Sequence, residues 1–482
     1  MQPLYFLALF GSRLITVLST LIFSHAMTTY AFGQFALINT NALAMQMVAG
    51  SWLVSIASRA MVSTDGQIDR AMMSAIMTAM FIIAGTITAV GMTYGALYPE
   101  QSWIAISTAA LATAFIIYEM LLALKNALGR EAAYASLAIY RNILALALGL
   151  GLVLIGVGPL GPVFGLLIST SICLALLPGA RRIWSGARPS WNALRLLRPH
   201  LGHGLAGACA LGIYILVNAP SRNIFAQQFG ADISGIWTLC SDLSYGPLAV
   251  IGNAYGLSQI RLIYISAAAA DATSLMRRAR SFIETSLTLI VPYSIGAVLF
   301  AQDAVRLMLA QAQVDMAVKI VIPATLQGCA LLILYCLTSV MLARRRFWLV
   351  GLMVLTVAVA ATIGAWVGTG IVDSSQLAMA GSAGAVGLWL IWGISKGVFH
   401  VRWRELVKLS LASAAMWASA TGTMAALDFL EAGRTMWIVA AGVSVLAFAG
   451  TAIWLRLSGF TDMLPPVVQR YFPHLANQID DD

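Results

Sequence analysis

Five charged side chains stand inside long apolar stretches of this chain: Arg13, Glu119, Arg141, Arg222 and Asp242. A charge in such a stretch is costly unless it meets water, an opposite charge or a ligand. The three arginines are candidates for binding an anionic ligand, and Asp242 and Glu119 are candidates for carrying a coupling ion. Structural ion pairs, such as Glu119 with Arg141 or Asp242 with an arginine, are the alternative. The sequence leaves both interpretations open.

Uncharged polar side chains follow two of the same stretches. Asn39 and Gln46 are two helical turns apart and share one helix face. Asp242 and Tyr245 fall in a second polar stripe at helical spacing. We predict that these four residues join the three arginines in binding a substrate. Hydrogen bonding between neighbouring helices is the alternative reading of both stripes.

Catalytic motifs are missing from the sequence. It contains no nucleotide-binding loop, no zinc-protease motif and no serine-hydrolase motif. The cysteines lie in apolar stretches at spacings that match no metal site: Cys173, Cys209, Cys240, Cys329 and Cys336. We therefore expect no catalytic residue, no cofactor, no metal and no built-in ATPase.

The composition determines which elements position these residues. Of the 482 residues, 60% are hydrophobic and 10% are charged, and the mean hydropathy is +0.86. A soluble domain carries roughly 25% charged residues, so most of this surface must face lipid. The net charge of +9 would suggest nucleic acid in a soluble protein. In a membrane protein, cationic residues instead gather in cytoplasmic loops, and we expect no nucleic-acid partner.

The apolar stretches predict an all-α integral membrane protein with about fourteen transmembrane helices. The expected spans are 4–27, 35–57, 71–97, 103–124, 133–157, 161–179, 202–228, 233–260, 282–301, 317–342, 347–368, 377–399, 406–427 and 435–457. With this number of spans, most of the 28 Lys and Arg residues fall on one side when both chain ends are cytoplasmic. The sequence thus predicts a multi-pass protein with cytoplasmic N- and C-termini.

The first two spans resemble the seventh and eighth. At an offset of 202 residues, 20–40 aligns with 222–242, and Ile22, Phe23, Gly33 and Leu37 meet identical residues. A parallel repeat predicts two six-helix lobes with a cleft between them. The predicted organisation is an N-terminal lobe at 1–180, a basic cytoplasmic linker at 181–201, a C-terminal lobe at 202–399, two further helices at 400–458 and a cytoplasmic tail at 459–482.

The sequence AFGQFALI that leads into the second span, with its echo ISGIWTLC, carries a family resemblance. It resembles the Wzx-type and polysaccharide-transport flippases of the multidrug/oligosaccharidyl-lipid/polysaccharide exporter superfamily. The resemblance implies alternating-access movement of lipid-linked oligosaccharides of the undecaprenyl-diphosphate type across the bacterial inner membrane, for exopolysaccharide or O-antigen synthesis. It also implies a cationic cavity for the anionic head, to which Arg13 is the best match. Membrane lipids and polysaccharide polymerase machinery are the implied partners.

Two other function classes remain as alternatives. One is a small-solute or drug exporter of the same superfamily. The other is a multispan polysaccharide polymerase or ligase, which would use a large outer loop with catalytic Arg or His. Here the predicted outer connections are short and contain no His, which disfavours the enzyme.

Overall fold

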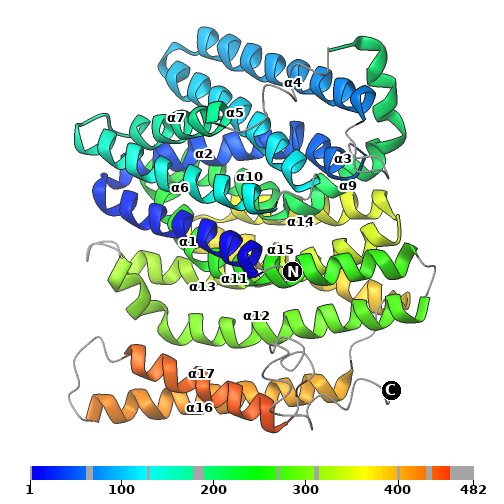
Figure 1. The fold of residues 1–482 in the computed structure, drawn as a ribbon. Helices are drawn as coiled ribbons and strands as arrows, with labels where there is room; N and C mark the ends of the chain where they lie inside the picture. The colour runs from blue at the N-terminus through cyan, green and yellow to red at the C-terminus, as the bar shows by residue number, and fades with distance from the viewer. Residues whose placement is uncertain are drawn as a thin grey trace.

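The computed structural model of this chain describes residues 3–60, 69–127, 131–176, 189–268, 272–308, 314–398, 402–429, 437–455 and 457, and helices dominate this part of the chain (Figure 1). The described residues contain no strand. An all-α membrane protein is therefore confirmed. The last residues of the predicted linker, 189–201, are described, whereas the predicted tail at 459–482 lies outside the described residues.

The helices follow one another through short connections. In chain order they are α1 (Pro3–Ala26), α2 (Thr29–Ala49), α3 (Ser51–Ala60), α4 (Arg70–Leu97), η1 (Pro99–Gln101), α5 (Ser102–Ala127), α6 (Glu131–Leu154), α7 (Leu160–Leu176), η2 (Trp191–His200), α9 (Leu201–Leu211), α10 (Ile213–Phe229), α11 (Ala231–Ala268), α12 (Ala272–Met308), α13 (Val314–Ala343), α14 (Phe347–Val367), α15 (Ile371–Ser395), α16 (Trp403–Phe429) and α17 (Trp437–Trp454). Each of the fourteen predicted spans coincides with one helix or with a broken pair of helices.

Eight of these helices are long and apolar enough to cross a membrane by themselves, among the described residues. The pair formed by Trp191–Leu211 and Ile213–Phe229 meets the same test together and is bent by 63° at its break. The other predicted spans coincide with helices that are shorter, more polar or only partly described. Length and composition thus support a multi-pass membrane protein.

Two predicted spans are broken helices. The span at 35–57 divides into α2 and α3 at Gly50, and the span at 202–228 divides into α9 and α10 at Gly212. At the first break, the amide of Gln46 donates to the hydroxyl of Ser51 over 3.0 Å. This bond satisfies a buried side chain where the regular helix is interrupted.

The two halves of the chain pack against each other through the helices that the repeat relates. Helices α1–α7 form contacts among themselves, as do α9–α15, and α2 crosses α11 while α3 packs on α9. The α16–α17 hairpin lies at one edge of the bundle against α12 (Figure 1). Helix α13 is surrounded by its neighbours, and 78% of the residues in its apolar 18-residue segment are buried.

The crossing of α2 and α11 occurs at two glycines that the repeat predicts to be equivalent. A Cβ atom added to Gly235 would lie 3.0 Å from the Cα of Gly33, and one added to Gly33 would collide with the carbonyl of Ala231. Helix α2 begins at Thr29 and α11 begins at Ala231, which is the same offset of 202 residues. Small residues at a helix crossing allow two backbones to approach closely.

Candidate functional site

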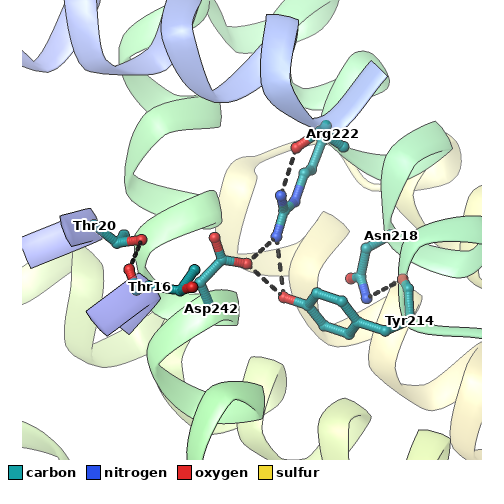
Figure 2. Close-up of polar contacts among 7 residues, drawn as sticks. Thr16, Thr20, Tyr214, Asn218, Arg222 and Asp242 are labelled. Carbon is teal, nitrogen blue, oxygen red and sulfur yellow. Dashed lines mark hydrogen bonds and ion pairs between the residues drawn. The ribbon is translucent and has the colours of Figure 1, made fainter. Parts of the chain in front are cut away.

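Arg222 on α10 is the centre of a buried polar cluster. Its side chain is 3% exposed, and its Nη2 lies 2.6 Å from Oδ1 of Asp242 on α11. Figure 2 shows the carboxylate of Asp242 turned toward both Arg222 and Tyr214. A charge-assisted bond of this length offsets much of the cost of burying the guanidinium. Of the ion pairs that the sequence left open for Asp242, the structure forms the one with Arg222.

Tyr214 completes this cluster from the first turn of α10. Its hydroxyl donates to Oδ1 of Asp242 over 2.8 Å and accepts a bond from Nη2 of Arg222 over 3.0 Å. The Tyr214 ring also stacks on Tyr245, with centroids 3.9 Å apart and planes 3° from parallel. Tyr245 thus belongs to the site, and the two tyrosines form one aromatic wall beside the ion pair.

The second end of the Arg222 guanidinium reaches the N-terminal half of the chain. Its Nη1 donates to the hydroxyl of Thr40 on α2 over 2.6 Å. Under the 202-residue offset, Thr40 is the equivalent of Asp242, so Arg222 bridges the two equivalent positions. One cation therefore connects the two helices that cross at Gly33 and Gly235.

A second polar contact lies one residue further along both helices. The side-chain amides of Asn41 on α2 and Asn223 on α10 each donate to the other, over 3.1 Å and 2.7 Å. Both bonds of this asparagine pair join uncharged amides. In the Arg222–Thr40 contact, the group on the α2 side, the Thr40 hydroxyl, is also uncharged. Together they form a polar seam between the two halves.

The carboxylate is the accessible partner of the ion pair. The Asp242 side chain is 32% exposed, whereas Arg222 is 3% exposed. A ligand that approaches from the exposed side of Asp242 therefore meets the carboxylate before it meets the guanidinium. The sequence left Arg222 open as a ligand-binding residue or as a partner of Asp242, and the structure forms the pair, while a role of Arg222 in substrate binding stays a prediction.

Buried polar atoms without a hydrogen-bond partner in the described part of the chain gather around this cluster. Six of them belong to α10 and α11: Asn218 Oδ1, Ser221 Oγ, Arg222 Nε, Trp237 Nε1, Thr238 Oγ1 and Ser241 Oγ. Each such atom costs about 1–3 kcal/mol. Polar groups left unsatisfied in a folded protein require a reason, and a functional site is a common one.

The remaining predicted residues lie in several places. Arg13 belongs to α1, but its side chain lies outside the described residues. The Nε of Arg141 donates to Thr170 over 3.1 Å, and its guanidinium lies over the rings of Phe115 and Tyr118. These partners stand on α5 and α7, so Arg141 makes a separate contact within the N-terminal half.

The other predicted polar residues, Gln46, Asn39 and Glu119, also lie at separate places in the structure. Gln46 is 3% exposed and bonds Ser51 at the α2–α3 break, and its role in substrate binding stays a prediction. Asn39 is half-buried, one residue before Thr40. Glu119 follows Tyr118 on α5, next to the ring that Arg141 covers. A coupling role for Glu119 stays a prediction.

The sequence interpretation missed Tyr214 and Asn223, although a signal for both was present. Tyr214, Asn218 and Arg222 stand at positions i, i+4 and i+8 of α10, which places them on one helix face. The apolar context of Tyr214 concealed its polar role. Trp237 on α11 is 0% exposed and packs edge-on against Phe225, with ring centroids 4.6 Å apart.

No metal-binding arrangement of His, Cys, Asp and Glu side chains exists among the residues that the structure describes. The five cysteines are free thiols. What the site offers is a carboxylate, two tyrosines and a guanidinium held between two halves of a helical bundle. These groups can bind polar or charged ligands by hydrogen bonds and charge, without covalent chemistry.

No protein-family model and no curated protein matches this chain. Solved structures do match it. The lipid II flippase MurJ, in an inward closed conformation, superposes with a TM-score of 0.63 at 13% identity, covering 94% of this chain and 99% of the flippase. The inward-facing conformation of a multidrug resistance MATE family transporter of the MOP superfamily gives 0.55 at 15% identity, covering 82% and 94%.

The chain has the fold of these transporters. A MOP superfamily transporter from Pyrococcus furiosus, described by a reverse polarity of its binding pocket, has a TM-score of 0.54 at 13% identity and covers 82% of this chain and 94% of its own. The MATE-type structures leave a larger part of this chain uncovered than the flippase does. The helices of the polar cluster, α2, α10 and α11, belong to the two halves that this fold brings together.

Proposed function

We propose that this protein is a flippase that moves lipid-diphosphate-linked oligosaccharides across the bacterial inner membrane by alternating access. The observation that carries the proposal is the extent of the fold. The lipid II flippase covers 94% of the chain, whereas the MATE transporters cover 82%. This difference in coverage corresponds to a segment about as long as the α16–α17 hairpin. The relative that shares more of this chain carries a lipid-linked substrate.

The polar cluster suits such a substrate. The glycan would contact Asp242 and the tyrosine wall, because carboxylates and phenols accept and donate bonds to sugar hydroxyls. The diphosphate would bind Arg222 at Nη1, whose described partner is Thr40, because guanidinium groups donate charge-assisted bonds to phosphate oxygens. Arg13 of α1 is the proposed second cation. The cationic loop pattern supports an orientation with both termini in the cytoplasm and the Gly33–Gly235 crossing toward the periplasm.

The test is the accumulation of lipid-linked oligosaccharide in cells that lack this protein. We expect intermediates to accumulate on the cytoplasmic face, to clear with the wild-type gene, and to persist with Arg222→Gln. Arg344→Gln is the control, because this arginine contacts Met276 and Val398 among its described partners and has no predicted binding role. Normal glycan export in cells without the protein would reject the flippase.

Export of organic cations is the second candidate, and a specific observation favours it. The exposed partner of the ion pair is the Asp242 carboxylate, which would attract a cation rather than an anion. The two candidates differ in their response to Asp242→Asn. Loss of export of a cationic dye in this variant, with glycan export unchanged, would favour the cation exporter.

A further inference from the structure

The strong contacts of the polar seam lie within one half of the chain, and the weaker contacts cross between the two halves. The ion pair of Arg222 with Asp242, and its support by Tyr214, lie wholly within the C-terminal half. The contacts that cross to α2 end on the hydroxyl of Thr40 and the amide of Asn41. These are neutral groups, and hydrogen bonds to neutral partners contribute far less than a buried ion pair would lose on separation.

This distribution allows the halves to part without separating opposite charges. If α2 moves away from α10, Arg222 keeps its carboxylate and its tyrosine, and only Thr40 and Asn41 leave. Both N–H groups of Arg222 Nη1 then lack a described partner, since Thr40 is the acceptor of the one bond that Nη1 makes among the described residues. Nε already has no hydrogen-bond partner among the described residues.

We propose that the pairs Thr40–Arg222 and Asn41–Asn223 form a gate between the two halves, and that an anionic ligand opens it by replacing Thr40 at Nη1 of Arg222. This inference rests on the proposed function, because it takes the ligand to carry phosphate oxygens. A ligand that takes the N–H of Nη1 now bonded to Thr40 competes with Thr40, so the closed seam and the site occupied in this way exclude each other. A ligand that binds one state only must shift the population toward that state.

The crossing of Gly33 and Gly235 makes the gate compact. Because the backbones meet there without side chains, α2 can approach α10 and α11 closely enough for the short side chains of Thr40 and Asn41 to reach their partners. The same closeness means that a small tilt of α2 breaks both polar contacts together. Two adjacent contacts that break together give a gate with two distinct states rather than a gradual opening.

The test is a cross-link across the seam. In a background with the five native cysteines replaced by Ala, Asn41→Cys and Asn223→Cys are combined, and disulfide formation under mild oxidation is followed in membranes. Ser244→Cys with Thr325→Cys is the matched control, because these hydroxyls are 2.8 Å apart within the C-terminal half. Inorganic pyrophosphate serves as the probe for the diphosphate head.

We expect pyrophosphate to slow the Asn41–Asn223 cross-link several-fold and to leave the control pair unchanged. Arg222→Gln should abolish the effect of pyrophosphate. Thr40→Val, which is nearly isosteric, removes the competing acceptor and should lower the half-effective pyrophosphate concentration about fivefold. Equal cross-linking rates with and without pyrophosphate, in both the wild-type and the Thr40→Val backgrounds, would overturn the proposal.

The cross-link involves no lipid-linked sugar, so its result is separate from that of the flippase test. Normal glycan export in cells lacking the protein rejects the flippase, whatever the cross-link shows. A cross-link that responds to tetraphenylphosphonium but not to pyrophosphate overturns the exchange at Arg222. Accumulated glycan intermediates together with that cross-link result would leave the flippase in place and reject only the gate.

Discussion

Gly33 and Gly235, which are equivalent under the internal repeat, touch each other where α2 crosses α11. A pair of equivalent residues in mutual contact is what a two-fold axis through the contact produces. The two halves of the chain are therefore in contact through matching surfaces at this point. The Arg222 bridge from Thr40 to Asp242 lies further along the same two helices, again at equivalent positions.

Replacing Gly33 by Ala should weaken the contact between the halves. The new methyl group would collide with the carbonyl of Ala231, so α2 and α11 must separate, at a cost of about 1–3 kcal/mol. Thermal unfolding of the purified protein in detergent measures the loss. Gly351→Ala is the control, because a Cβ there meets nothing within 4 Å and Ala favours a helix. Equal unfolding temperatures for the two variants would contradict a close crossing.

The two members of the ion pair should differ in their response to substitution. Asp242→Asn leaves the guanidinium of Arg222 buried and without its counter-ion, a change that costs about 3–5 kcal/mol in buried pairs. Arg222→Gln leaves Asp242, which is 32% exposed and can be hydrated, so the loss should be smaller. Chemical or thermal unfolding of both variants checks the order. A greater loss of stability in Arg222→Gln than in Asp242→Asn would contradict the assignment of Arg222 as the more buried member of the pair.

The hairpin of α16 and α17 should depend on Glu284. This carboxylate is 5% exposed on α12 and accepts bonds from the backbone N, Nε and Nη2 of Arg402, just before α16. Glu284→Gln removes the charge and should weaken the attachment by about 1.5–3 kcal/mol. Faster hydrogen exchange in α16, with α4 unchanged, is the expected readout. Glu100→Gln, at an exposed position, should leave exchange in α16 as it is.

Gln46 should prove to be a structural residue. Gln46→Leu removes the bond to Ser51 at the α2–α3 break and leaves a buried hydroxyl with a weaker partner, which should cost about 1–2 kcal/mol. The response of the Asn41–Asn223 cross-link to pyrophosphate should be retained in this variant. Loss of that response with unchanged stability would return Gln46 to the binding site.

The helical architecture could be predicted from the sequence because each span carries its own evidence. A stretch such as 347–368 is apolar over the thickness of a bilayer, and no unpaired backbone can cross lipid, so it must be helical. The breaks at Gly50 and Gly212 could not be predicted in the same way. Gly occurs throughout these helices, and whether one of them interrupts a helix depends on the neighbours that accept the bend.

The candidate site could be predicted only in part. Arg222, Asp242 and Tyr245 were identified because charges and polar stripes in apolar helices are conspicuous. Tyr214 and Asn223 were missed, and the bond from Gln46 to Ser51 at the α2–α3 break was not foreseen. The type of a residue shows that it needs a polar partner, but it does not show which neighbouring helix supplies that partner.

The sequence by itself determined the class of protein, the position of its helices and the repeat that relates Gly33 to Gly235, because these depend on hydropathy and spacing along one chain. Only the tertiary structure decided that Arg222 pairs with Asp242, reaches Thr40 and lies behind the carboxylate. These contacts depend on how α2, α10 and α11 are rotated and crossed against one another. Side-chain periodicity determines the faces of a single helix, whereas the packing of several helices decides which faces meet.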